Sequence, residues 1–169
     1  IGKGSKVCIY SPNTPEYAAI FFGVARIGAT NTTANPLYNA HELAKQLTDS
    51  GAKLIFTVPP LAERAVAAAA TVGAEVITLG EAPGCVPFAE FIKTGGAAPT
   101  GLDAIHPAVP IDAANDLVTL PYSSGTTGLP NCVMLTHRNT AANLAQCDFV
   151  APGAPGATCR TRRTSLLTF

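Results

Sequence analysis

The sequence predicts an α/β fold, a mainly parallel sheet with helices on both faces. Short apolar runs, which are typical of strands buried on both faces, occur at residues 6–11, 53–58, 75–79 and 116–123. Helical patterns separate the first three of these runs along the chain. Because a helix between two strands permits a crossover connection, the alternation indicates that these strands run parallel and occupy the centre of the sheet.

The first strand, KVCIYS (6–11), leads into a helix that we expect over residues 15–27. Thr14 is the expected N-cap, Pro15 suits the first turn, and Gly28 ends the helix. This helix is apolar around nearly its whole circumference, which predicts that it is buried.

A second helix follows residues 30–38, which are expected to be extended and then to turn. Asn39 can cap this helix, with Glu42 reaching back as in a capping box. Gly51 ends it, and KLIFTV (53–58) forms the next strand.

An alanine-rich helix then opens at Pro59 and Pro60, runs to about Val72 and closes at Gly73. The segment EVITL (75–79) is the strand that follows it. The chain up to this strand therefore reads as repeated strand–helix units of one domain, which suits a length of 169 residues.

Residues 80–115 are rich in Gly, Pro and Ala, and we interpret them as an irregular excursion with one short helix at VPFAEFIKTG. The strand at 116–123 comes next, and a further strand is expected at 133–137. Asn139 is then expected to cap a helix that runs to about Gln146. A loop at 123–131 thus joins two strands.

Charge and hydropathy exclude several classes of function. The chain has 11 basic and 11 acidic residues, so its net charge does not favour nucleic acid or an anionic membrane as a partner. The longest strongly apolar run, YAAIFFGVARIGA, is interrupted by Arg26 and is shorter than the roughly 20 residues that cross a bilayer, so we expect no transmembrane segment. The only basic cluster lies in the atypical tail at 147–169, which we interpret as solvated or as sequence outside the native frame.

The five cysteines lie far apart and form no Cys-x-x-Cys pair, which argues against a zinc site. Free thiols and a reducing compartment are the expectation. The chain opens at Ile1 and not at methionine, so we expect it to begin inside a longer protein.

The loop at 123–131 has the composition of an anion-binding nest. Its glycines allow sharp turns that present backbone N–H groups, and its Ser and Thr residues add hydroxyl donors. A hairpin loop without a ligand is the alternative that composition leaves open. The Walker A pattern is excluded, because Pro130 and Asn131 stand where that pattern needs glycine and lysine.

The motif SSGTTGLP followed by VMLTHRN resembles the phosphate-binding signature of the adenylate-forming (AMP-dependent synthetase/ligase) superfamily, which usually reads SSGTTGLPKGV. The stretch from PNTPEY to KLIFT resembles the N-terminal region of its 4-coumarate-CoA ligase-like acyl-CoA synthetases. The resemblance covers residues 1–146 and implies an incomplete N-terminal portion of the large domain of such an enzyme.

The resemblance implies a reaction in which ATP with Mg²⁺ activates a carboxylic acid, aromatic such as 4-coumarate or a fatty acid, to an acyl-adenylate that CoA converts to a thioester. It implies a cytoplasmic or peroxisomal location. It implies that the loop grips the β- and γ-phosphates of ATP and that Asn131 occupies the position of the family's lysine. The residues implied to bind nucleotide are Ser123, Ser124, Gly125, Thr126, Thr127, Gly128 and Asn131.

Two departures from the family pattern stand beside the loop. Asn131 brings no charge, and Cys132 replaces a glycine, so we expect backbone strain if that position needs a positive φ. His137 aligns beside the loop and is expected to give structural support.

The family's adenine, magnesium and catalytic lysine segments would fall beyond Phe169, so no catalytic residue or metal ligand is assigned. A non-catalytic or truncated relative that keeps a weak phosphate-binding module, or a luciferase-like member, is the alternative.

Overall fold

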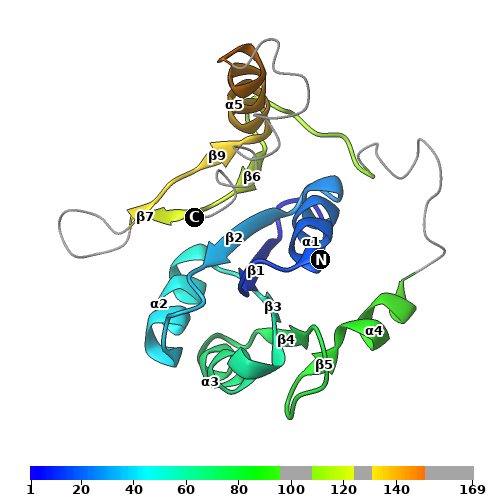
Figure 1. Cartoon of the computed structure of the whole chain (residues 1–169), viewed down its shortest axis with the longest axis vertical. Coiled ribbons are helices and arrows are strands. Elements are labelled where there is room, and N and C mark those ends of the chain that lie inside the picture. Colours follow the sequence, from blue (N-terminus) through cyan, green and yellow to red (C-terminus); the bar gives the residue numbers. More distant parts are fainter. Residues whose placement is uncertain (96–107, 124–130, 151–169) are drawn as a thin grey trace.

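The computed structural model of the chain describes residues 1–95, 108–123 and 131–150. Within these ranges the strands form one seven-stranded sheet, in the order β5-β4-β3-β1-β2-β6-β9, and a separate pair, β7-β8 (Figure 1). The elements are β1 (Lys6–Tyr10), α1 (Pro15–Arg26), β2 (Thr30–Ala34), α2 (Ala40–Ser50), β3 (Leu54–Thr57), η1 (Pro59–Leu61), α3 (Ala62–Val72), β4 (Glu75–Thr78), β5 (Val86–Pro87), α4 (Phe88–Phe91), η2 (Ile92–Thr94), β6 (Leu117–Thr119), β7 (Tyr122–Ser123), β8 (Asn131–Cys132), β9 (Leu135–Thr136) and α5 (His137–Val150).

The large sheet is mainly parallel, as the sequence predicts. Strand β1 pairs in parallel with β2 on one side and with β3 on the other, and the parallel pairing continues through β4 to β5. Strand β6 adds to β2 in parallel, and β9 pairs with β6 in the antiparallel sense at the edge. The carboxyl ends of the parallel strands therefore lie at one edge of the sheet.

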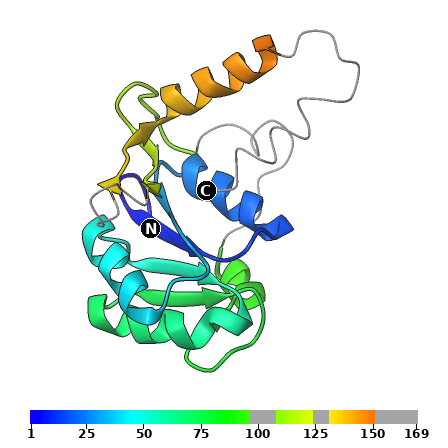
Figure 2. The same cartoon turned by 60° about the vertical axis from the view of Figure 1, so that its left-hand side comes forward.

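Helices cover both faces of the sheet, and β1 shows how. Cys8 and Tyr10 belong to a buried cluster with residues of α2 and α3, whereas Val7 and Ile9 pack in a second cluster with residues of α1 and α4. Successive side chains of a strand point to opposite faces, so the apolar run is buried on both sides. Figure 2 shows α1 and α2 on opposite sides of the sheet.

Helix α1 is buried along one side only, so the expectation of a fully buried helix is wrong. Ile20, Val24 and Ala25 face the sheet, but the side chain of Phe22 is 62% exposed and Ala18 is exposed too. Among the described residues, only the side of α1 that faces the sheet is covered, and the opposite side is exposed.

The expected extended segment after α1 is β2, a central strand of the sheet. Its sequence, TNTTA, is polar, yet four of its five residues are buried. Burying polar groups is costly unless they form hydrogen bonds, and these side chains donate to the backbone of the segment around β6. The bonds run from Thr30 Oγ1 to Leu117 O (3.2 Å), from Asn31 Nδ2 to Val118 O (3.3 Å) and from Thr32 Oγ1 to Leu120 O (3.1 Å).

The expected capping box of α2 and the glycine stops of α2 and α3 are confirmed, whereas the helix expected to open at Pro59 and Pro60 starts with the 3-10 turn η1 and becomes α-helical at Ala62. Asn39 Oδ1 accepts a bond from the Glu42 amide, and Glu42 Oε2 accepts from the Asn39 amide, which completes the capping box. Gly51 and Gly73 take left-handed conformations at the C-termini of these helices, where a side chain would be strained. Thr14 precedes α1 as expected but makes no side-chain capping bond among the described residues.

The region that follows 115 departs from the expected elements. The strand expected over 116–123 is divided at Leu120 and Pro121 into β6, in the large sheet, and β7, in the separate pair. Proline has no N–H for a ladder bond, which accounts for the break. The strand expected at 133–137 is shorter, since only Leu135–Thr136 form β9 within that range, and β8 (Asn131–Cys132) lies before it.

Helix α5 begins at His137 and extends to Val150, so the expected start at Asn139 and end near Gln146 are both wrong. Thr136 Oγ1 accepts from the Asn139 amide (3.2 Å), and Asn139 Oδ1 accepts from the Thr136 amide (3.0 Å). Thr136 is therefore the N-cap, and Asn139 is the reciprocal partner three residues inside the helix.

Candidate functional site

The stem of a hairpin holds both ends of the candidate phosphate loop. In β7 and β8, Ser123 pairs with Asn131 and Tyr122 pairs with Cys132. The first hydroxyl of the motif and the position of the family's lysine are therefore cross-strand neighbours. The other expected phosphate ligands lie outside the described residues, and these are Ser124, Gly125, Thr126, Thr127 and Gly128.

This hairpin lies past the carboxyl edge of the parallel sheet. Strand β6 runs parallel to β2, and β7 follows it directly beyond Pro121. At the same edge, the connections that leave β1 and β2 diverge, because α1 and α2 lie on opposite faces of the sheet. Such a divergence opens a crevice outside the carboxyl ends of adjacent strands, which is where α/β sheets bind their ligands.

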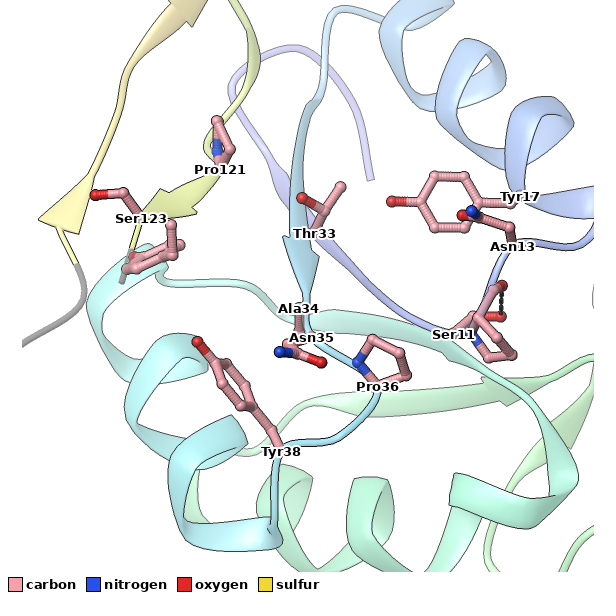
Figure 3. A pocket seen from close by; sticks show the side chains of 12 residues that line it. Ser11, Asn13, Tyr17, Thr33, Ala34, Asn35, Pro36, Tyr38, Pro121 and Ser123 are labelled. Carbon is pink, nitrogen blue, oxygen red and sulfur yellow. Dashed lines mark hydrogen bonds between the residues drawn. The ribbon is translucent and has the colours of Figure 1, made fainter. Parts of the chain in front are cut away.

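A pocket of about 680 Å³ occupies this crevice (Figure 3). Its polar groups come from the connection after β1, from α1, from the end of β2 and from the hairpin, and all are uncharged. Ser123 lines the pocket and also begins the candidate phosphate loop, so the two features adjoin. The polar residues that define the pocket include Ser11, Asn13, Tyr17, Thr33, Tyr38 and Ser123.

Two phenols at the pocket remain protonated at neutral pH. Burial raises the pKa of Tyr17 to about 12, and its hydroxyl is directed toward Thr33 in Figure 3. Burial also raises the pKa of Tyr122, and so does the hydrogen bond that Tyr122 donates to Asp49. Tyr17 therefore keeps an O–H group at the pocket, whereas the proton of Tyr122 is donated to Asp49 and is not available to a ligand.

The backbone at Cys132 is extended within β8, and no described residue other than glycine has a positive φ. The expectation of strain at this position is therefore wrong. Glycine is not required here, because residues other than glycine adopt extended backbone conformations without strain.

His137 starts α5, and its amide donates to the carbonyl oxygen of Asp116, the residue just before β6 (3.3 Å). It does not line the pocket. Its Nε2 is buried and has no hydrogen-bond partner among the described residues.

The sequence reasoning missed the contributions of Asn13 and Tyr17 to the pocket. Both stand shortly after the apolar strand β1, and polar residues just beyond the carboxyl end of a buried strand are the signal that could have found them. It also missed Asp49, whose contact with Tyr122 joins residues 73 positions apart.

Within the described ranges, no group of three or more His, Cys, Asp or Glu side chains is arranged to hold a metal ion. None of the helices in those ranges combines the length and apolar character that crossing a membrane requires.

Comparison with known proteins gives consistent matches. The family model described as AMP-binding enzyme matches residues 1–167, which takes in most of the tail that the motif resemblance left out. 4-coumarate-CoA ligase 3 of Oryza sativa subsp. japonica is 44% identical over 150 residues, and 4-coumarate-CoA ligase 2 of Petroselinum crispum is 38% identical over 147. These alignments take in 86% of this chain and 25% and 26% of the two relatives.

Solved structures agree with this assignment. A long-chain-fatty-acid-CoA ligase (FadD1) from Archaeoglobus fulgidus matches with a TM-score of 0.74 and 30% identity, and ATP-bound MatB from Rhodopseudomonas palustris matches with 0.71 and 28%. Each covers 88% of this chain, which in turn covers 28% of each of those chains. The chain thus spans about a quarter of the length of the curated relatives it matches, and by the family model and these identities it belongs to the AMP-binding enzymes, the family of the adenylate-forming acid-CoA ligases.

Proposed function

We propose that the chain supplies the phosphate-gripping portion of an AMP-forming acid-CoA ligase. The motif at 123–131, its hairpin stem at the carboxyl edge of the sheet and the relatives named as CoA ligases support this proposal. The 4-coumarate-CoA ligases among the relatives favour an aromatic acid as the substrate of the whole enzyme, and a fatty acid is the second candidate.

In this reaction a carboxylate oxygen of the acid attacks the α-phosphorus of ATP. The bond between the α-phosphorus and the bridging oxygen breaks, and that oxygen leaves with pyrophosphate. The thiol of CoA then attacks the acyl carbon, loses its proton and displaces AMP. Negative charge grows on the leaving phosphates, so preorganised N–H and O–H donors at the loop would lower the barrier of the first step.

The donor chemistry of the loop fits phosphate oxygens. Ser123 contributes a hydroxyl at the mouth of the pocket, and the remaining Ser, Thr and Gly residues of the motif extend this set. The motif contains no carboxylate, so Mg²⁺ would arrive on the phosphate oxygens of the nucleotide.

The observation that carries the proposal is that Ser123 belongs to both the hairpin stem and the polar pocket. A nucleotide whose terminal phosphates rest on the loop would therefore have the uncharged pocket directly beside them. Such an arrangement would hold the charged phosphates of the nucleotide on the loop and an uncharged part of a ligand in the adjacent pocket.

A second candidate function is a non-catalytic or truncated relative that binds phosphates weakly. Asn131, which brings no positive charge to the loop, favours it. The cytoplasm or the peroxisome is the proposed location under either function.

Calorimetric titration of the chain with ATP and Mg²⁺ tests the phosphate grip, with Thr127→Ala as the variant and Thr48→Ala as its matched control on an exposed face of α2. We expect weak binding that Thr127→Ala lowers by roughly fivefold, which is the value of one neutral hydrogen bond. Thr48→Ala should bind like the unmodified chain. Absence of any binding, or equal affinities for all three proteins, would contradict the proposal. Pyrophosphate exchange into ATP, measured with 4-coumarate or a fatty acid, separates the two candidate functions.

A further inference from the structure

We propose that helix α2 positions the phosphate loop, through Gln46 and Asp49, by holding the chain on both sides of Pro121. This inference rests on the proposed function, because it concerns how the stem of the proposed phosphate-binding loop is held in position. Gln46 and Asp49 are three residues apart on α2 and therefore project from neighbouring positions on one side of the helix. Neither is a catalytic residue; both act through the β6–β7 segment.

The first contact holds the residue before Pro121. Gln46 Nε2 donates to Thr32 Oγ1 (2.9 Å), and that hydroxyl donates to the carbonyl oxygen of Leu120 (3.1 Å). The Leu120 amide also donates to the Asn31 carbonyl oxygen (2.7 Å). Gln46, Thr32 and Leu120 are all buried, so water cannot readily substitute for this relay.

The second contact holds the residue after Pro121. The hydroxyl of Tyr122 donates to Asp49 Oδ2, with 2.5 Å between the two oxygens. Tyr122 is half-buried and Asp49 is exposed, so the carboxylate contacts the stem of the hairpin from the solvent side of α2. A hydrogen bond from a hydroxyl to an ionised carboxylate is stronger than one between two neutral groups.

The backbone alone holds this region weakly, which is why side-chain contacts matter here. Strand β6 has a single ladder pair with β2, at Thr119, and its two pairs with β9 are at Leu117 and Thr119, so no ladder pair of β6 involves Leu120 or Pro121. Pro121 cannot donate to a ladder, and the β7–β8 stem is only two residues long on each side. A two-stranded hairpin of this size has little stability of its own.

Helix α2 is itself held firmly in place against the sheet. Its capping box closes the N-terminus, and Leu43 and Leu47 are fully buried against the sheet. Tyr122 is next to Ser123 in β7 and opposite Cys132 in β8, so a contact at Tyr122 directs both strands of the stem. The geometry thus links a rigid helix to the base of the loop.

A double-mutant cycle of Tyr122→Phe and Asp49→Ala tests the contact in the whole chain. The first readout is amide hydrogen exchange at Ser123, Asn131 and Cys132 without ligand. The second is the affinity for inorganic tripolyphosphate with Mg²⁺. Each single variant should speed the exchange and weaken binding by roughly fivefold, the value of one net hydrogen bond, and the double variant should add little. Asp49→Asn keeps an acceptor oxygen and should retain most of both properties.

Tyr10→Phe is the matched control. It makes the same substitution and removes a hydroxyl bond of the same length, from Tyr10 to the Tyr38 carbonyl oxygen (2.5 Å), in the buried core. It should lower the free energy of unfolding but leave exchange in the hairpin unchanged. A merely structural role for Tyr122 would make the two variants alike in every readout.

The outcomes separate the two proposals. Unchanged exchange in Tyr122→Phe, or strictly additive effects in the double variant, would overturn the positioning role of α2 while leaving the phosphate grip in place. If the unmodified chain does not bind tripolyphosphate, the proposed function fails, and the positioning of a phosphate site by α2 fails with it, even where exchange in the hairpin responds to Asp49→Ala.

Discussion

The side-chain nitrogen of Asn31 lies 3.3 Å from the carbonyl oxygen of Val118, a residue 87 positions later in the chain. The same nitrogen donates to the carbonyl oxygen of Phe21 on α1 (3.0 Å). One buried amide therefore joins the central strand β2 to a helix on one face and to β6, the strand that leads to the candidate phosphate loop.

Replacing Asn31 by alanine should lower the free energy of unfolding by about 1 to 3 kcal/mol, because the carbonyl oxygens of Val118 and Phe21 lose the hydrogen bonds that the Asn31 amide donates. Urea unfolding at neutral pH measures this. Thr48→Ala serves as the control, since Thr48 is exposed and bonds only within its own helix among the described residues, to the Ala44 carbonyl oxygen. It should change stability by less than about 0.5 kcal/mol. Equal effects of the two substitutions would contradict the role given to Asn31.

Replacing Asn39 by alanine should cost about 1 kcal/mol, because the capping box of α2 loses the oxygen that satisfies the Glu42 amide. The loss should appear as a lower urea midpoint with an unchanged slope. Lys45→Ala, an exposed change on the same helix, is the comparison and should leave the midpoint nearly unchanged. If Asn39→Ala matches Lys45→Ala, the box contributes nothing to stability.

Local sequence signals predicted those parts of the fold that depend on neighbours in the chain. The box of Asn39 and Glu42 is one such signal, and the glycine stops of α2 and α3 are others. At α5 the same chemistry was assigned to the wrong residue. Thr and Asn are both good N-cap residues. Composition alone therefore does not say whether Thr136 or Asn139 is the N-cap of α5 and which of them is its partner inside the helix.

Features that depend on distant partners could not be predicted in the same way. TNTTA is too polar to suggest a central strand, and its burial becomes favourable through hydrogen bonds to distant groups, among them the carbonyl oxygens of the segment around β6 and the side chain of Gln46. The candidate site divides similarly. The Ser, Thr and Gly motif is recognisable by itself, whereas the contact between Asp49 and Tyr122 exists only once α2 lies beside the hairpin.

Acid should weaken the contact between Lys3 and Asp116, whose charged atoms lie 2.7 Å apart. The hydrogen bond from Lys3 holds the pKa of Asp116 below its ordinary value, and the hydrogen bond from Asn115 does the same for Asp112. A depressed pKa in the folded state gives stability that is present above the unfolded pKa of about 3.9 and is lost as the pH falls through the folded value.

Asp116→Asn should therefore be less stable than the unmodified chain at pH 7, and the difference should shrink as the pH falls below about 4. Urea midpoints of the two proteins between pH 7 and pH 2.5 test this. A difference that stays constant across the range would show that the charge of Asp116 does not matter.

Thiol labelling should distinguish the cysteines by burial. Cys8 is fully buried, and burial raises its pKa to about 12, whereas Cys132 is exposed in the hairpin stem. Because the thiolate is the reactive form, iodoacetamide at pH 8 should modify Cys132 in the folded chain and Cys8 only after unfolding. Peptide mass spectrometry measures both sites. Rapid labelling of Cys8 without denaturant would contradict the core that the sheet and α2 form around it.

Restoring a positive charge at Asn131 should strengthen the phosphate grip. Asn131 is exposed and pairs with Ser123 at the mouth of the pocket, so a lysine here would stand at the base of the loop that we propose holds the phosphates of ATP. One regained charge-assisted hydrogen bond contributes about 1.5 to 3 kcal/mol, and exposure to solvent favours the lower end, so Asn131→Lys should bind ATP with Mg²⁺ roughly tenfold more tightly.

Asn131→Gln adds length without charge and should leave the affinity of the unmodified chain unchanged, and the gain from lysine should shrink as the salt concentration rises. Because the backbone at Cys132 is extended, adding Cys132→Gly to Asn131→Lys should bring no further gain. Titration calorimetry of the three variants with ATP and with tripolyphosphate measures each effect. An equal affinity of Asn131→Lys and Asn131→Gln would show that charge at this position does not limit binding, and a gain that required Cys132→Gly would show that the stem must change its backbone to admit the lysine.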